Sequence, residues 1–516
     1  MDCSSEGSLT IDNPAHRPSE DIRGRCRDMS FGQYHDMLLD DVLLEIFDFY
    51  VNEDMDEYFG PFEVKQRIEG WITLAHVCCR WRSVVFRSPR RLNLRLVCTH
   101  KKRVRDILDV WPPLPLVIAN SYCDFDESDA ENTIAALEHN DRVCQIILGP
   151  YYTSSHFKYF MDSAALLKPF PELTVLRFVY GGLDPILPNS FLGGTAPRLR
   201  TLALSGVSFP GLPNLLLSTT HLIHLDLFNI PDSGYIPPEA MTATLSVLSN
   251  LEILRLNFQN PQPRPALESR RPPPRQLTRS ILPSLTEIRF QGDSEYLEEI
   301  LARIDAPRLN EIRITLFHQI IFHTPELFQF ISRRPTPRAP EAGYINLCYS
   351  GIAVKFPLQT SNYGVPTVQI SYIASNGQLP SLRQICTPSL PPVSTLEDLY
   401  IFEEIYWRSP RQGDAENALW LELLHPFAAV KNLYLSEEIV PRFVFALQEL
   451  LRGRMTEVLP TLENIFLEEF QSSGPLDEGI EKFVAARRLI GHPVAVCRWD
   501  RDKKQEMHWE FFDYLY

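Results

Sequence analysis

Two short helical regions near the N-terminus are predicted by apolar positions spaced three and four residues apart. The first apolar face comprises Leu39, Val42, Leu43, Ile46 and Phe47. The second comprises Leu74, Val77, Cys78, Trp81, Val84 and Val85, with Pro89 after its end. Two helices of this size bury little, and their apolar positions exceed what one small core would use. We therefore expect part of this surface to be reserved for another protein.

From residue 104 onward the pattern changes to short apolar runs of the form L-x-x-L-x-L, with other aliphatic or aromatic residues as substitutes. The copies are Val143-Ile146-Leu148, Leu173-Leu176-Phe178, Leu199-Leu202-Leu204, Leu222-Leu225-Leu227, Leu251-Leu254-Leu256, Leu285-Ile288-Phe290, Leu309-Ile312-Ile314, Leu396-Leu399-Ile401, Val430-Leu433-Leu435 and Leu462-Ile465-Leu467. Most begin 23 to 34 residues after the previous copy. This spacing is typical of an irregular leucine-rich-repeat solenoid, in which each repeat adds one strand to a parallel sheet and buries its leucines on its neighbours.

The segments between these copies contain candidate return helices at 239–250, 295–304, 417–427 and 440–454. The long gap between Leu309 and Leu396 holds either unrecognised repeats or a large insertion, with strands expected at 344–349 and 368–373. The segment 479–500 is predicted to form a helix, a glycine-containing turn and a last strand that caps the solenoid. An unrelated α/β sheet with leucine-rich strands is the alternative.

The domain organisation follows from these patterns. Residues 1–33 carry few large apolar residues and are expected to be disordered. Residues 34–99 form the small helical domain, and residues 100–516 form the repeat region. Proline-rich surface loops are expected at 259–276 and 332–343.

Composition narrows the function classes. The chain of 516 residues has a net charge of -15, which argues against a nucleic-acid partner held by overall charge. No apolar stretch is long enough to cross a membrane. The ten cysteines form no C-x-x-C pair, which favours reduced thiols in the cytoplasm or nucleus.

No motif for catalysis or cofactor binding is found. The chain lacks a phosphate-binding G-x-x-x-x-G-K-[ST] loop and a G-x-S-x-G nucleophile elbow. His221 and His224 fall on a predicted strand with their side chains on opposite faces, which is poor metal geometry. Carboxylate pairs such as Glu403-Glu404 are interpreted as solvated loop residues. We expect no enzyme activity, catalytic residue, metal or cofactor.

One face of the predicted sheet is a candidate surface for a target protein. The residue between the last two apolar positions of each copy points away from the core, because side chains alternate along a strand. These residues are Arg177, Ala203, Asp226, Arg255, Arg289, Arg313, Tyr400, Tyr434 and Phe466. Arginines in the first half and aromatics in the second would suit an acidic stretch with an apolar anchor. A merely solvated strand face is the alternative.

Three segments of the helical domain together resemble the F-box of basidiomycete, and hence fungal, F-box proteins. They are Asp41–Phe47 (DVLLEIF), Leu74–Arg82 (LAHVCCRWR) and Ser88–Arg90 (SPR). The sequence departs from the family pattern in lacking a proline after Leu39 and in its longer connection from Tyr50 to Arg67. An ordinary helical hairpin in a larger domain is the alternative.

This resemblance implies binding to a Skp-type adaptor and, through it, to a cullin–RING ubiquitin ligase. The residues carried over for adaptor contact, or for the small core behind it, are Leu39, Val42, Leu43, Ile46, Phe47, Leu74, Val77, Trp81 and Val84. The expected function is substrate recognition for an SCF-type (Skp–cullin–F-box) ligase, in which the repeats hold an unknown target protein. A repeat scaffold that acts without ubiquitin machinery is the alternative function.

Overall fold

The computed structural model describes residues 38–51, 70–99, 104–120, 127–151, 163–180, 185–261, 279–317, 324–333, 342–348, 351–357, 367–373, 386, 393–403, 414–451, 457–468 and 475–499. The predicted disordered segment 1–33 and most of the two proline-rich loops lie outside these residues. The chain divides into two compact units, residues 1–95 and residues 96–516.

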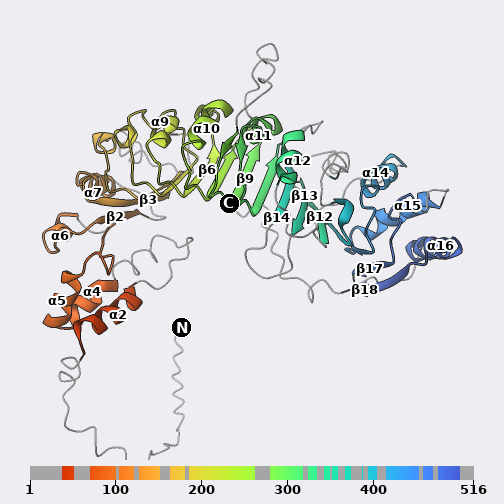
Figure 1. Cartoon of the computed structure of the whole chain (residues 1–516), viewed down its shortest axis with the longest axis horizontal. Helices are drawn as coiled ribbons and strands as arrows, with labels where there is room; N and C mark the ends of the chain where they lie inside the picture. Colours follow the sequence, from red (N-terminus) through yellow and green to blue (C-terminus); the bar gives the residue numbers. More distant parts are fainter. Residues whose placement is uncertain are drawn as a thin grey trace, which may run out of the picture. The chain divides into compact units, whose positions relative to one another are not determined.

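The first unit is helical. It contains α2 (Asp40–Val51), α4 (Gly70–Val77) and α5 (Cys79–Arg87), labelled in Figure 1. The second predicted helical region is therefore two helices, because the backbone of Cys78 is extended and its Sγ accepts a hydrogen bond from the Trp81 N–H at 3.4 Å. This contact caps the start of α5.

The core of the helical unit is aromatic. The rings of Phe47 and Trp81 lie 4.8 Å apart, and the buried Trp71 donates a hydrogen bond from Nε1 to the Arg95 carbonyl at 2.9 Å. An ion pair between Arg80 and Asp40, with 2.9 Å between Nη2 and Oδ1, joins α5 to the first turn of α2. These contacts bring together segments that are 24 and 40 residues apart in the sequence.

The second unit is mixed α/β and is built on one long, mostly parallel sheet. Its strands are β1 (Leu96–Cys98), β2 (Leu116–Asn120), β3 (Val143–Tyr151), β4 (Val175–Tyr180), β5 (Thr201–Ser205), β6 (His224–Ile230), β7 (Ile253–Phe258), β9 (Glu287–Gly292), β11 (Glu311–Leu316), β12 (Ala342–Cys348), β13 (Gly351–Pro357), β14 (Thr367–Ile373), β15 (Asp398–Glu403), β16 (Asn432–Leu435), β17 (Asn464–Glu468) and β18 (Ala495–Trp499). Their order in the sheet is β1-β2-β3-β4-β5-β6-β7-β9-β11-β14-β13-β12-β15-β16-β17-β18. Two further short strands, β8 (Ser280–Ile281) and β10 (Ile304–Asp305), pair with each other.

The repeated apolar positions explain this sheet. In seven neighbouring strands the same repeat position is paired in register, by Ile146, Leu176, Leu202, Leu225, Leu254, Ile288 and Ile312. Each of these side chains is at most 4% exposed. Because every row of leucines is covered by the next repeat, the strands stabilise one another in the way expected for leucine-rich repeats. All ten predicted strand copies are found, whereas β1 and β2 were not predicted.

The gap between Leu309 and Leu396 contains an insertion in the sheet. Strands β12 and β14 were predicted, and β13 was not. Strand β13 is antiparallel to both of its neighbours, while β14 is parallel to β11 and β12 is parallel to β15. The insertion therefore restores the strand direction, and the parallel sheet continues after it.

Helical segments connect the strands. They are α6 (Val104–Leu108), α7 (Glu127–Leu137), α9 (Leu212–Leu217), α10 (Pro238–Leu245), α11 (Ser294–Leu301), α12 (Pro325–Ser332), α14 (Asp414–Leu424), α15 (Val440–Leu450) and α16 (Pro475–Leu489), with short 3₁₀ turns at Ala164–Leu167, Phe191–Gly194, Asp232–Gly234 and Val393–Thr395. Helices α9 to α12 lie on one side of the sheet (Figure 1). The four predicted return helices are found as α10, α11, α14 and α15.

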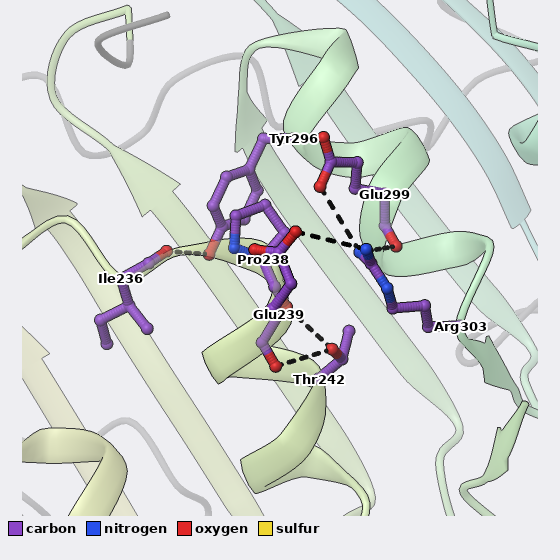
Figure 2. Close-up of polar contacts among 7 residues, drawn as sticks. All are labelled: Ile236, Pro238, Glu239, Thr242, Tyr296, Glu299 and Arg303. Carbon is purple, nitrogen blue, oxygen red and sulfur yellow. Dashed lines mark hydrogen bonds and ion pairs between the residues drawn. The ribbon is translucent and has the colours of Figure 1, made fainter. Parts of the chain in front are cut away.

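Polar contacts join successive return helices on that side. Figure 2 shows Tyr296 of α11, whose hydroxyl donates a hydrogen bond to the Ile236 carbonyl at 2.9 Å. Arg303, just after α11, forms an ion pair with Glu239 of α10, with 3.3 Å between Nη2 and Oε1. It also pairs with Glu299 of its own helix, with 3.5 Å between Nη1 and Oε2. Thr242 donates its hydroxyl hydrogen to carbonyl groups within α10, those of Pro238 and Glu239. The interface between these repeats thus contains specific hydrogen bonds as well as apolar packing.

A carboxyl group caps the start of α12. Glu298 of α11 accepts hydrogen bonds from the backbone N–H groups of Glu326 and Leu327 at 2.8 and 2.9 Å. Burial raises the pKa of Glu298 to about 7, although these two hydrogen bonds oppose the shift. The raised pKa means that the folded state holds this proton more tightly than the unfolded chain does.

Replacing Glu298 by glutamine is expected to flatten the dependence of stability on pH. The contribution of the Glu298 proton is fully present below pH 4.5 and is lost as the pH rises through about 7. Glutamine does not titrate, and its single amide oxygen can replace only one of the two Glu298 oxygens that accept these backbone hydrogen bonds. Urea unfolding from pH 5 to 8 should show a smaller fall in the free energy of unfolding for E298Q than for the wild type. An E298Q variant with the same pH dependence of stability as the wild type would contradict the raised pKa of Glu298.

Candidate functional site

An apolar strip on α2 faces away from the core of the helical unit. Its residues, which we call the α2 surface, are Leu39, Val42, Ile46, Phe49 and Tyr50. Leu39 is 71% exposed, Ile46 is 49% exposed and Phe49 is 77% exposed. The strip covers an arc of about 100° at 3.6 residues per turn, next to a buried arc of similar width.

The structure separates the predicted adaptor-contact residues into two groups. Leu43, Phe47, Leu74 and Val84 are buried in the unit itself, so they belong to the small core that was the alternative role for these residues. Leu39, Val42, Ile46 and Val77 are exposed, and Trp81 is half-buried against Phe47. The exposed group is therefore the part of the prediction that remains available to a partner.

Two members of the α2 surface were missed at the sequence level. Phe49 and Tyr50 lie three and four residues after Ile46, so the same helical spacing extends to them. They were overlooked because the predicted face ended at Phe47. Continuing the spacing from Leu39 through Val42 and Ile46 would have identified both residues.

The second candidate surface is the sheet face opposite the return helices. Strand register places Arg177, Ala203, Asp226, Arg255, Arg289 and Arg313 side by side in one row. Through the inserted strands the row continues as Gln369, Lys355 and Tyr344, and then as Tyr400, Tyr434 and Phe466. All of the predicted target-binding residues therefore occupy equivalent positions on this face.

The arginines in the middle of this row are already matched by carboxylates. Nη1 of Arg255 lies 3.6 Å from Oδ2 of Asp226, and Nε of Arg255 lies 2.8 Å from Oε1 of Glu287. Nε of Arg289 lies 2.7 Å from Oε1 of Glu287, and Nη2 of Arg289 lies 3.5 Å from Oε1 of Glu311. Arg313 also pairs with Glu311. Three positive and three negative groups thus form one network, which differs from the net positive surface expected from the arginines alone.

The pKa values of two carboxyl groups in this network are shifted in opposite directions, because burial and the arginine charges oppose each other. Burial would raise the pKa of Glu287, but the hydrogen bond from Arg255 and the charges of Arg289, Arg255 and Arg313 lower it overall. Burial raises the pKa of Asp226 despite the nearby arginines. Glu287 is consequently ionised at neutral pH and holds Arg255 and Arg289 in place.

Aromatic rings form a stacked ladder in the second half of the row. The centroid distances are 4.6 Å from Tyr344 to Tyr400, 4.1 Å from Tyr400 to Tyr434 and 4.4 Å from Tyr434 to Phe466, with nearly parallel ring planes. Trp499 meets the rings of Tyr400 and Tyr434 nearly at right angles, and its Nε1 donates to the Leu435 carbonyl at 3.3 Å. The ladder is therefore internally packed.

This packing corrects the prediction of an open aromatic anchor. Tyr400 and Tyr434 are only 9% and 4% exposed. Burial also raises the pKa of the Tyr344 hydroxyl to about 12. Phe466 and Tyr344 are half-buried at the ends of the ladder. Stacking of identical positions across strands removed the surface that the sequence pattern had suggested.

A further correction concerns Glu403, which was interpreted as a solvated carboxylate. Its side chain is only 3% exposed, and its Oε1 lies 3.0 Å from Nη1 of Arg442 on α15. Its backbone N–H donates a hydrogen bond to Ser436 Oγ at 3.1 Å. Glu403 therefore belongs to a buried ion pair between the sheet and a return helix.

The described part of the chain offers no metal-binding group of three or more His, Cys, Asp or Glu side chains. Among the helices in these same ranges, none combines the length and the apolar character needed to cross a membrane. The two surfaces above are candidate sites for contacts with other proteins.

Comparison with known proteins gives only a distant structural likeness. No protein-family model matches the chain, and no curated protein matches it. A similar solved structure is the crystal structure of the leucine-rich repeat-containing protein LegL7 from Legionella pneumophila. The two chains are 11% identical, and the match covers 76% of this chain and 97% of that chain with a TM-score of 0.24. The repeat fold is therefore assigned from the register of the strands and the buried leucine rows.

Proposed function

We propose that this chain is the substrate-recognition subunit of an SCF-type ubiquitin ligase. The helical unit, as an F-box, docks a Skp-type adaptor and thereby a cullin–RING ligase. The repeat sheet binds the protein to be ubiquitinated. The chain itself makes no covalent bond, and it acts by raising the local concentration of the target near the ubiquitin-charged enzyme.

The α2 surface is the observation that carries this proposal. Leu39, just before α2, and four apolar side chains of α2 form one exposed strip, while the adjacent arc of the same helix already fills the core with Leu43, Leu44 and Phe47. Exposing such a strip to water is unfavourable unless another protein covers it. The position of the strip agrees with the segment that resembles an F-box, which supports an adaptor as the protein that covers it.

Replacing Ile46 by aspartate is expected to weaken copurification with a Skp-type adaptor, with an affinity loss of about tenfold to hundredfold. Ile46 is half-exposed on the α2 surface, so the change places a charge in the proposed contact without removing a core side chain. Affinity purification from cell extract, followed by binding measurements with purified adaptor, would test this.

The matched control is Leu217→Asp on α9. Leu217 is 50% exposed, against 49% for Ile46, and it lies in the other unit of the chain. The L217D variant should bind the adaptor like the wild type. Equal adaptor binding by I46D and the wild type would contradict the proposed docking, and so would absence of adaptor from the wild-type purification.

The charge network suggests what kind of target the sheet face accepts. Arg255, Arg289 and Arg313 are balanced by Asp226, Glu287 and Glu311, so a purely acidic segment would have to displace carboxylates already in place. A target surface with alternating charges could pair with both signs at once. We therefore propose a folded or extended segment of mixed charge as the target.

A repeat scaffold without ubiquitin machinery is the second candidate function. The long parallel sheet with its row of half-buried polar side chains favours it, because this surface is present independently of what covers α2. The same copurification separates the two functions. A chain that binds other proteins but never a Skp-type adaptor is a scaffold.

A further inference from the structure

The sheet of the repeat unit ends on an apolar edge. Strand β18 pairs with β17, and no strand among the described residues pairs with its other edge. Beside it lies an open groove of about 760 Å³, lined by Leu467, Ile480, Val484 and Val496 together with the charged Glu481 and Arg488. The predicted helix, glycine turn and last strand are all present, and Gly491 has the positive φ of 81° expected in the turn.

This end differs from a closed cap. Val496 is registered with the buried Ile465 of β17, and it is nevertheless 45% exposed. Leu489 at the end of α16 is 87% exposed, and the adjacent Ile490 is 41% exposed. A terminal repeat normally presents a polar outer face, since no further repeat covers it. An unpaired strand edge next to exposed apolar side chains is a surface that another strand can join.

The outer face of α16 is self-complementary in charge. Glu481, Val484, Ala485 and Arg488 line the groove at helical spacing, with the opposite charges at the ends and the apolar pair in the middle. Glu481 and Arg488 are seven residues apart, or about 10.5 Å along the helix. When two such helices lie antiparallel, Glu481 of each faces Arg488 of the other, while Val484 and Ala485 meet at the centre.

We propose that a second copy of this chain covers this end. A two-fold axis passing near Cys497, the middle residue of β18, would make β18 antiparallel to the same strand of the other copy and would bring the two α16 helices together. The contact is isologous, so it closes after two copies. It extends the sheet by pairing the free edge of β18, and it covers Val496 and Leu489. This proposal is independent of the adaptor-docking function.

Sedimentation velocity and light scattering of the full-length chain test the association. The wild type should be a dimer whose dissociation constant rises about tenfold in E481R and about tenfold in R488E, because each change sets like charges against one another. The double variant E481R/R488E should recover the wild-type dissociation constant, since the opposite charges are again paired. V110E, at an exposed valine of the same unit, is the control and should remain dimeric.

A crosslink tests the arrangement of the two strands. In the proposed antiparallel pair the two Cys497 Cβ atoms are about 4.5 to 5.5 Å apart. A short bismaleimide should join the two copies, because each thiol adds across one maleimide double bond. The crosslinked dimer should be lost in C497S and kept in C79S, which removes an exposed cysteine of the helical unit.

Three results would overturn the proposal. One is a wild-type chain that stays monomeric at every concentration. This result would also follow if another protein or the chain's own residues 500–516 covered the groove. Another is a dimer unaffected by both single charge reversals. The third is a dimer that crosslinks equally well in C497S.

Discussion

Replacing Arg442 by alanine is expected to lower the free energy of unfolding by about 3 to 5 kcal/mol. Arg442 lies 3.0 Å from Glu403, whose side chain is only 3% exposed. The substitution would leave a buried carboxylate without its positive partner, and a buried charge is costly when it is not compensated. Urea unfolding of the full chain, followed by circular dichroism, would measure the loss.

Two control variants separate this effect from simple loss of a surface contact. The double variant E403M/R442M removes both charges and retains side chains of similar length, so it should recover most of the stability. Lys431→Ala breaks the exposed pair between Lys431 and Glu397, in which Nζ and Oε1 are 2.8 Å apart, and should lower the stability far less than R442A does. An R442A variant as stable as K431A would contradict the burial of the pair.

Replacing Arg487 by leucine is expected to cost about 3 kcal/mol of unfolding free energy. This arginine of α16 is only 1% exposed, and its Nη2 lies 3.2 Å from the Leu459 carbonyl and 3.4 Å from the carbonyls of Pro460 and Leu462. It thereby attaches the last helix to the turn before β17. Leucine would leave these buried oxygens without this donor, and the loss should appear as a lower midpoint of thermal unfolding.

Lys482→Leu is the matched control on the same helix. Lys482 is exposed and pairs with Glu478 one turn away, with 2.7 Å between Nζ and Oε1, so its loss should lower the stability far less than the loss of Arg487. Arg487→Lys keeps the charge but lacks the planar group with several donors, and it should be intermediate. Equal stability of R487L and K482L would rule out the attachment role of Arg487.

The strands that could be predicted from the sequence are those with alternating apolar positions. Leu254 and Leu256 face the core on either side of Arg255, and that alternation was readable in LRLNF. Strand β2 was missed because Leu116, Val117, Ile118 and Ala119 are all buried, so its apolar run has no period of two. Strand β13 was missed because it belongs to an antiparallel insertion outside the repeat spacing.

In the helical unit, sequence spacing identified the apolar positions but could not tell which of them are buried in the core and which are exposed. Val42 and Leu43 are neighbours in the sequence and lie about 100° apart around α2, and only Leu43 is buried. Which arc becomes core depends on where α4 and α5 pack, and these helices lie at least 19 residues later in the chain than the end of α2. Exposed and buried positions of equal hydrophobicity are therefore distinguished by tertiary contacts.

By itself, the sequence determined that Arg255, Arg289 and Tyr434 occupy the outward face of a repeated strand, because the alternation of side chains is a local property of the backbone. Only the tertiary structure decided what those residues do there. Glu287 reaches Arg255 across 32 residues of sequence, and Tyr434 stacks between Tyr400 and Phe466. Such partners depend on strand register over about one repeat length, and that register is set by the buried leucine rows of the whole sheet.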